Sequence, residues 1–245
     1  MATLALMYLA AFAGAEVVTA LVHPLWAIML HFALLFGLIV TSAKAGKERP
    51  HGLFLALGLV PLIRIVSLSV PSADLWRPYW YLLASLPLIV GAFAIVRILN
   101  RSPVEIGLTI RAIPLQTVIV LCGIGIGVLD YVVLKPDAFI SALSWRAVVP
   151  PALILVLATG FAEELIFRGV IQREAEVLGP WGWVYAAVLS SVLQIGHHSI
   201  GHWAVALAMA LLFGWAVKRS GSILGVSLSH GLINIGLYLV FPFVI

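Results

Sequence analysis

Two adjacent glutamates lie in one of the most apolar runs of the sequence. Glu163 and Glu164, followed by Arg168, fall within the run from Val148 to Ile171. An ionised group inside a bilayer costs several kcal/mol unless it is paired or wet, so an acid in such a run is a functional hypothesis by default. Glu164 and Arg168 are four residues apart and share a helix face, which predicts an ion pair. Glu163 points about 100° away and lacks that partner.

Two later apolar stretches carry side chains that could act with Glu163. The first ends at His198, and the second contains His230 and Asn234, which are four residues apart and therefore on one helix face. Structural alternatives exist for each group. The charges around Glu163 could form an interfacial cluster, His198 could be an interfacial residue, and the His230–Asn234 pair could be a polar clamp between helices.

Together these residue types could hydrolyse an amide without a covalent nucleophile. A carboxylate and an imidazole that share a water molecule form a general base. A second histidine and an asparagine amide can donate hydrogen bonds to the oxyanion of a tetrahedral intermediate. Glu163, His198 and His230 could instead bind zinc with an open position for water, although the His-Glu-x-x-His zinc motif is absent from the sequence.

The elements that must position these residues are transmembrane helices. The chain has 245 residues, of which 63% are hydrophobic and only 10% charged, far from the composition of soluble domains. Because about twenty apolar residues span a bilayer, we expect an all-α polytopic bundle of about eight or nine transmembrane helices. The candidate spans are 3–22, 25–43, 52–70, 79–99, 114–134, 149–172, 181–198, 202–217 and 222–243.

The distribution of lysine and arginine predicts the orientation of the bundle. With the N-terminus in the cytoplasm, ten basic residues fall on the cytoplasmic side and only Arg77, Lys135 and Arg146 on the other, as the positive-inside rule requires. The cytoplasmic set is Lys44, Lys47, Arg49, Arg97, Arg101, Arg111, Arg168, Arg173, Lys218 and Arg219. The first fifteen residues lack the basic start of a signal peptide, so we expect a first transmembrane helix there. The expected location is the cell (inner) membrane.

The candidate residues lie at compatible depths in such a bundle. Glu163 and His198 are each about 24–27 Å from a hairpin turn at Gly179-Pro180, at 1.5 Å per residue. This estimate requires the sixth helix to continue beyond its apolar limit to Leu178. His230 and Asn234 lie about 15–21 Å from the next turn on the same side, so a common site is geometrically allowed.

The stretches described above resemble the motifs of the CPBP (CAAX protease and bacteriocin-processing, or Abi) intramembrane proteases, which include the type II CAAX prenyl endopeptidases. The Glu-Glu-x-x-x-Arg motif of that family corresponds to Glu163–Arg168, and its His-x-x-x-Asn motif to His230–Asn234. Its Phe-x-x-x-His motif corresponds to Gln194–His198, with glutamine in place of phenylalanine. The resemblance covers residues 145–240 of a single membrane domain, and residues 1–144 carry no matching motif.

The resemblance implies a role for each motif residue. Glu163 and His198 would activate water, His230 and Asn234 would stabilise the oxyanion, and Glu164 and Arg168 would hold the geometry of the site. The implied substrates are membrane-associated peptides or proteins that are CAAX-like, lipidated, or equipped with a C-terminal anchor or leader. We favour a mechanism without a cofactor, with zinc as the alternative.

Two other function classes compete with an intramembrane endopeptidase. A proton-coupled transporter could use the glutamates and histidines as a relay, but the sequence shows no repeat or pair of broken helices. A non-catalytic immunity or assembly factor could keep the fold, but it has no chemical reason to retain all the motifs. Besides a peptide substrate, the only partner indicated is the lipid bilayer, and nothing in the sequence indicates nucleic acid.

Overall fold

The apolar segments fold as helices along the whole chain. The structure is a computed structural model that describes residues 1–46, 49–71, 75–197 and 199–245. No strand occurs within these ranges, which agrees with the all-α class expected from the sequence. The first part of the chain forms α1 (Ala2–Leu21), α2 (Pro24–Lys44), α3 (Arg49–Leu57), α4 (Leu59–Ser69), α5 (Arg77–Ile98) and α6 (Ile113–Leu134).

The second part of the chain contains shorter helices and several π-helical segments. One continuous helical stretch runs through α7 (Trp145–Leu155), η1 (Val156–Phe161), α8 (Ala162–Glu164), η2 (Leu165–Ile171), α9 (Gln172–Glu174) and η3 (Ala175–Leu178). The remaining elements are α10 (Gly182–Val192), η4 (Ile195–His197), α11 (Ile200–Ser220), α12 (Leu224–Ile235), η5 (Gly236–Val240) and α13 (Phe241–Val244). The sixth span thus continues to Leu178, as the depth argument required.

Eight helices within the described ranges are long and apolar enough to cross a membrane. The protein is therefore an integral, multi-pass membrane protein. The segment expected at 181–198 differs from the prediction, because its α-helix covers only Gly182–Val192, about 16 Å of rise. Its apolar pattern is interrupted by Gln194 and Gly196, where the chain forms a turn and a short 3₁₀ segment.

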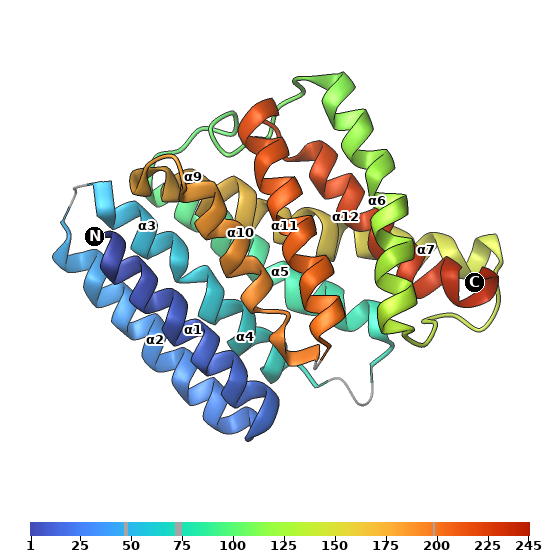
Figure 1. Cartoon of the computed structure of the whole chain (residues 1–245). Helices are drawn as coiled ribbons and strands as arrows, with labels where there is room; N and C mark the ends of the chain where they lie inside the picture. Colours follow the sequence, from blue (N-terminus) through green and yellow to red (C-terminus); the bar gives the residue numbers. More distant parts are fainter. Residues whose placement is uncertain (47–48, 72–74, 198) are drawn as a thin grey trace.

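The helices form two groups (Figure 1), which meet along α5 and where α1 contacts η4 and α10. In the first group α1 packs along α2, and α2 packs on α3 and α4. In the second group α12 packs between α6 and η1, while α10 and α11 form a pair. α5 contacts α4 on one side and α7 and η1 on the other. The segments that carry Glu163 and His230 therefore lie near the junction of the two groups.

Two glycines let α12 approach its neighbours closely. A Cβ atom added at Gly160 of η1 would lie 2.5 Å from the backbone oxygen of Ser227, and one added at Gly123 of α6 would lie 2.7 Å from that of Ser229. Small residues at helix crossings allow such close backbone contact in membrane proteins. This packing places the residues that follow Ser229 on α12 directly against the Glu163–Glu164 stretch.

Candidate active site

A cavity of about 380 Å³ lies where the two groups of helices meet. Its wall includes the end of α4, the start of α5, the end of α6, the start of α11 and the last turns of α12. These helix ends all belong to the face of the bundle opposite the N-terminus (Figure 1). The cavity therefore extends from mid-bundle, at Glu163, toward that face.

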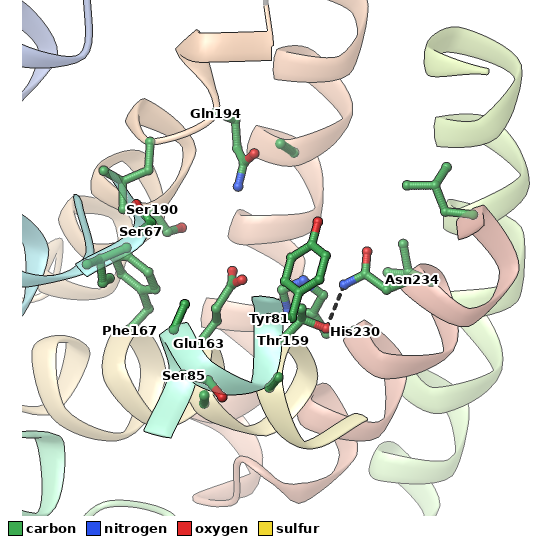
Figure 2. A pocket seen from close by; sticks show the side chains of 18 of the residues that line it. Ser67, Tyr81, Ser85, Thr159, Glu163, Phe167, Ser190, Gln194, His230 and Asn234 are labelled. Atoms are coloured by element: carbon green, nitrogen blue, oxygen red, sulfur yellow. Dashed lines mark hydrogen bonds between the residues drawn. The ribbon is translucent and has the colours of Figure 1, made fainter. Parts of the chain in front are cut away.

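The two adjacent glutamates have different surroundings. Glu163 is half-buried and lines the cavity, and its carboxylate points into it (Figure 2). It makes no hydrogen bond or salt bridge to another described residue. Glu164 is fully buried and points away from the cavity into the helix packing. One carboxylate is thus left for a ligand or water, and the other is committed to the protein.

Glu164 accepts hydrogen bonds from two buried side chains. Its Oε1 atom lies 3.2 Å from Nη1 of Arg168 and 2.8 Å from Nδ1 of His230. The Glu164–Arg168 ion pair predicted from their spacing is therefore present, and the bond to His230 is an addition. Arg168 also donates from Nη2 to the backbone oxygen of Ala210 on α11, at 3.4 Å. This network ties η2, α11 and α12 to the same carboxylate.

The bond to Glu164 determines which nitrogen of His230 can serve a substrate. A carboxylate only accepts hydrogen bonds, so the Nδ1 atom of His230 carries the proton that it shares with Glu164. The ring lines the cavity, which leaves Nε2 as the nitrogen for chemistry there. In the neutral ring Nε2 accepts a hydrogen bond, and in the imidazolium it donates one.

Asn234 lies one helical turn beyond His230 and lines the same cavity. Its side-chain nitrogen donates to Oγ1 of Thr159 at 2.8 Å, and that hydroxyl donates to the backbone oxygen of Leu155 at 2.6 Å. Figure 2 shows this bond between Asn234 and Thr159 at the edge of the cavity. An asparagine amide has two N–H groups, so one donor remains after Thr159 is satisfied.

The local backbone around the glutamates departs from a regular α-helix. The single α-helical turn that carries Glu163 and Glu164 lies between the π-helical segments η1 and η2. π-Helical bulges are rare and occur frequently at functional sites. A sequence pattern with the 3.6-residue period of an α-helix does not reveal such π-helical segments. The Glu164–Arg168 ion pair forms even though the turn that carries Arg168 is wider than an α-helical turn.

Three of the candidates expected from the sequence line one cavity: Glu163, His230 and Asn234. Glu164 and Arg168 lie outside the cavity lining, where Glu164 contacts both His230 and Arg168. His198, the remaining catalytic candidate, lies outside the described residues. Gln194, which replaces the phenylalanine of the family motif, points into the cavity from the side opposite Glu163 (Figure 2).

The structure adds an acid–histidine pair that sequence reasoning missed. Oδ1 of Asp130 on α6 and Nδ1 of His202 on α11 are 2.7 Å apart, and both residues are buried and line the cavity. The signal was present in the sequence, because Asp130 is an acid inside the apolar segment 114–134. The desolvation argument applied to Glu163 applies equally to Asp130.

Comparison with known proteins finds one family whose model matches part of this chain. Residues 145–236, from the start of α7 to the first residue of η5, match the family model described as type II CAAX prenyl endopeptidase Rce1-like. No curated protein and no solved structure matches the chain. The matched segment contains Glu163, Glu164, His230 and Asn234, whereas α1 to α6 lie outside it. Over this segment the chain is similar to the Rce1-like type II CAAX prenyl endopeptidases, in agreement with the resemblance of its motifs.

Proposed function

We propose that this protein is an intramembrane endopeptidase that hydrolyses a peptide bond of a membrane-associated substrate, using a water molecule activated by Glu163. The substrate would be CAAX-like, lipidated, or carry a C-terminal anchor or leader. The observation that carries the proposal is the carboxylate of Glu163, which makes no hydrogen bond or salt bridge to another described residue and shares one cavity with His230 and Asn234.

The proposed reaction begins when Glu163 accepts a proton from water, assisted by His198. The resulting hydroxide attacks the carbonyl carbon of the scissile bond, and the carbonyl oxygen becomes an oxyanion. The protonated Glu163 then gives its proton to the leaving nitrogen as the carbon–nitrogen bond breaks. A positioned acid–base group of this kind contributes about 10²- to 10⁴-fold to rate.

His230 and Asn234 are the proposed donors to the oxyanion. His230, in its imidazolium form, donates from Nε2 while Glu164 holds Nδ1. Asn234 donates through the N–H that Thr159 does not use. Removal of one such donor typically lowers kcat about 10²- to 10³-fold. Glu164 and Arg168 act indirectly, because they fix the orientation of the His230 ring.

Zinc is the alternative to metal-free hydrolysis, with Glu163, His198 and His230 as ligands. No group of three His, Cys, Asp or Glu side chains within the described ranges is placed to hold a metal ion. His198, the third ligand of this alternative, lies outside those ranges, and a catalytic zinc site has three protein ligands. Removing and restoring metal distinguishes zinc-dependent from metal-free hydrolysis.

We further propose that the N-terminus lies in the cytoplasm of the cell (inner) membrane, as the distribution of lysine and arginine indicates. The cavity would then open in the half of the bilayer that faces away from the cytoplasm. Substrates cut there would present the scissile bond near the outer membrane surface.

The test of the proposed function is cleavage of a candidate membrane peptide by the purified protein in lipid vesicles, with products identified by mass spectrometry. We expect Glu163→Ala, His198→Ala and His230→Ala each to lower the rate of cleavage about 10²-fold or more. Glu176→Ala is the matched control, because Glu176 is an exposed acid paired with Arg173 outside the cavity. Wild-type turnover by all three active-site variants would show that these residues are wrongly assigned. Uptake of the peptide without cleavage, lost in Glu163→Gln, would support a transporter instead.

Metal dependence is tested with the same preparation. We expect exhaustive chelation to leave turnover unchanged, because the proposed chemistry uses only side chains and water. Elemental analysis should accompany the activity measurement. Stoichiometric zinc, with activity lost on its removal and recovered on its return, would establish the zinc mechanism.

A further inference from the structure

A second charged network lies inside the helices that precede the family-matched segment. It consists of Glu16 on α1, His31 on α2 and Arg64 on α4, and Glu16 and His31 are fully buried. Charged groups in this environment need partners, because burial of an unpaired ion is expensive. The reaction described above makes no use of this network.

Arg64 joins this network to the end of α10. Its Nε atom donates to Oε1 of Glu16 at 2.6 Å, and its Nη2 atom donates to the backbone oxygen of Leu193. Leu193 directly follows the last residue of α10. The final carbonyl groups of a helix have no partner within the helix, and a cation there is favourable. Arg64 therefore links α1 and α4 to the C-terminal end of α10.

The end of α10 forms part of the cavity wall. Arg64, Leu193 and Gln194 all line the cavity that contains Glu163. The side chain of Arg64 is 19% exposed, whereas its partner Glu16 is 0% exposed. Figure 2 shows Gln194 entering the cavity from this wall, across from Glu163. The segment after Gln194 leads to His198, so a shift of this helix end would move the wall relative to Glu163.

Arg168 is arranged in a parallel way in the matched segment. It too binds a buried glutamate and reaches a backbone oxygen of a further helix, that of Ala210 on α11. In both cases an arginine is oriented by a carboxylate and fixes another helix through a carbonyl. A guanidinium can make both bonds at once, whereas a lysine ammonium lacks the fork geometry.

We propose that Arg64, held by Glu16, is a positioning residue that fixes the C-terminal end of α10 against the cavity. The N-terminal helices then contribute to the catalytic geometry in addition to anchoring the protein. The inference deepens the proposed endopeptidase function and rests on it for its kinetic readout, but the position of the helix end can be measured without cleavage.

The decisive variant is Arg64→Lys, which keeps the charge beside Glu16 but loses the bond to Leu193. We expect kcat to fall about tenfold or more, because small misplacements of reacting groups have effects of that size. Hydrogen exchange measured by mass spectrometry should show faster exchange of the backbone amides of residues 193–197. Arg101→Lys is the matched control. Arg101 forms the same kind of pair, with Nε 2.7 Å from Oε1 of Glu174, but does not line the cavity.

A charge exchange separates positioning from simple stabilisation. The double variant Glu16→Arg, Arg64→Glu can restore the ion pair, but a glutamate cannot donate to the oxygen of Leu193. We expect the thermal midpoint to recover toward the wild-type value while kcat and the exchange at 193–197 do not recover. If Arg64→Lys does not fold, Glu16→Gln provides a second probe, since it weakens the hold on Arg64 and should also accelerate exchange at 193–197.

The possible results distinguish this inference from the proposed function. Wild-type kcat and unchanged exchange at 193–197 in Arg64→Lys would overturn the positioning role while leaving the endopeptidase function in place. Recovery of kcat together with stability in the double variant would also overturn it. Absence of cleavage by the wild-type protein would count against the proposed function, and the exchange at 193–197 would still decide the role of Arg64.

Discussion

The two halves of the molecule contain buried networks of the same three residue types with different geometry. Glu164, Arg168 and His230 form one, and Glu16, Arg64 and His31 form the other. In each network the arginine and histidine face Oε1 of the glutamate, and Oε2 has no hydrogen-bond partner among the described residues. The networks differ in their histidines. Nδ1 of His230 is 2.8 Å from the carboxylate, whereas Nε2 of His31 is 3.7 Å away.

This difference indicates that residue type alone does not assign a catalytic role. His230 is oriented by a hydrogen bond and lines the cavity. His31 is fully buried outside the cavity, and neither ring nitrogen has a hydrogen-bond partner within the described ranges. The catalytic assignment of His230 therefore depends on the orientation of its ring. The variants below test the comparison in order of decreasing expected effect.

The largest effect is expected from Glu164→Ala. This change removes the shared acceptor of Arg168 and His230, and breaking a buried ion pair typically destabilises a protein by about 3–5 kcal/mol. Glu16→Ala should destabilise less, because the side chain of Arg64 is 19% exposed and that of Arg168 only 3%. Thermal unfolding in detergent measures both. Equal losses of thermal stability in the two variants would show that the two networks contribute equally to the stability of the protein.

A smaller and more selective effect is expected from the histidines. His230→Phe should lower kcat about 10²-fold or more, because it removes the proposed oxyanion donor. His31→Phe should leave kcat unchanged and should not lower the thermal midpoint, since the ring it replaces makes no hydrogen bond to a described residue. Steady-state kinetics and melting curves of both variants provide the test. A comparable fall in kcat for His31→Phe would remove the distinction between the networks.

The smallest effect is expected from the exposed carboxylate of Glu105, which lies in the connection between α5 and α6 and serves as a solvated reference for the buried pairs. The carboxylate of Glu105 accepts hydrogen bonds from the backbone N–H and the hydroxyl of Ser102, and it lies near Arg101 and Arg173. These hydrogen bonds, with the nearby arginines, lower the pKa of Glu105 below its usual value of 4.5. Such an exposed group contributes at most about 1 kcal/mol.

The sign of the pH dependence follows from the lowered pKa of Glu105. Because the folded state holds the ionised form more strongly, the contribution is present above pH 4.5 and is lost as the pH falls through the folded pKa. The thermal midpoint of Glu105→Gln should therefore lie slightly below that of the wild type at pH 6, and the difference should shrink as the pH falls below 4.5. A difference that grew on acidification would contradict this account.

The sequence was sufficient to predict the fold class and several local relations. Apolar length predicted transmembrane helices, and the four-residue spacing predicted the Glu164–Arg168 pair, because both depend only on local helix geometry. The meeting of Glu163 with His230 and Asn234 in one cavity was consistent with estimated depths, since short turns constrain where successive helices lie.

Features that depend on packing between helices could not be predicted in this way. The bond between His230 and Glu164 depends on the close contact of α12 with η1 at Gly160, which sequence spacing does not encode. The Glu16–Arg64 pair joins residues 48 positions apart on separate helices, so neither has a local partner that would reveal it. The early end of α10 reflects an interruption at Gln194 that average hydropathy overlooks.

The central claim is that Glu163 performs the chemistry and Glu164 holds the structure. It is tested most directly by measuring kcat and the thermal midpoint of Glu163→Gln and Glu164→Gln side by side. For Glu163→Gln we predict a fall in kcat of about 10²-fold or more with an unchanged midpoint, because its carboxylate makes no hydrogen bond or salt bridge within the described ranges. For Glu164→Gln we predict a lowered midpoint. Wild-type kcat in Glu163→Gln would contradict the account.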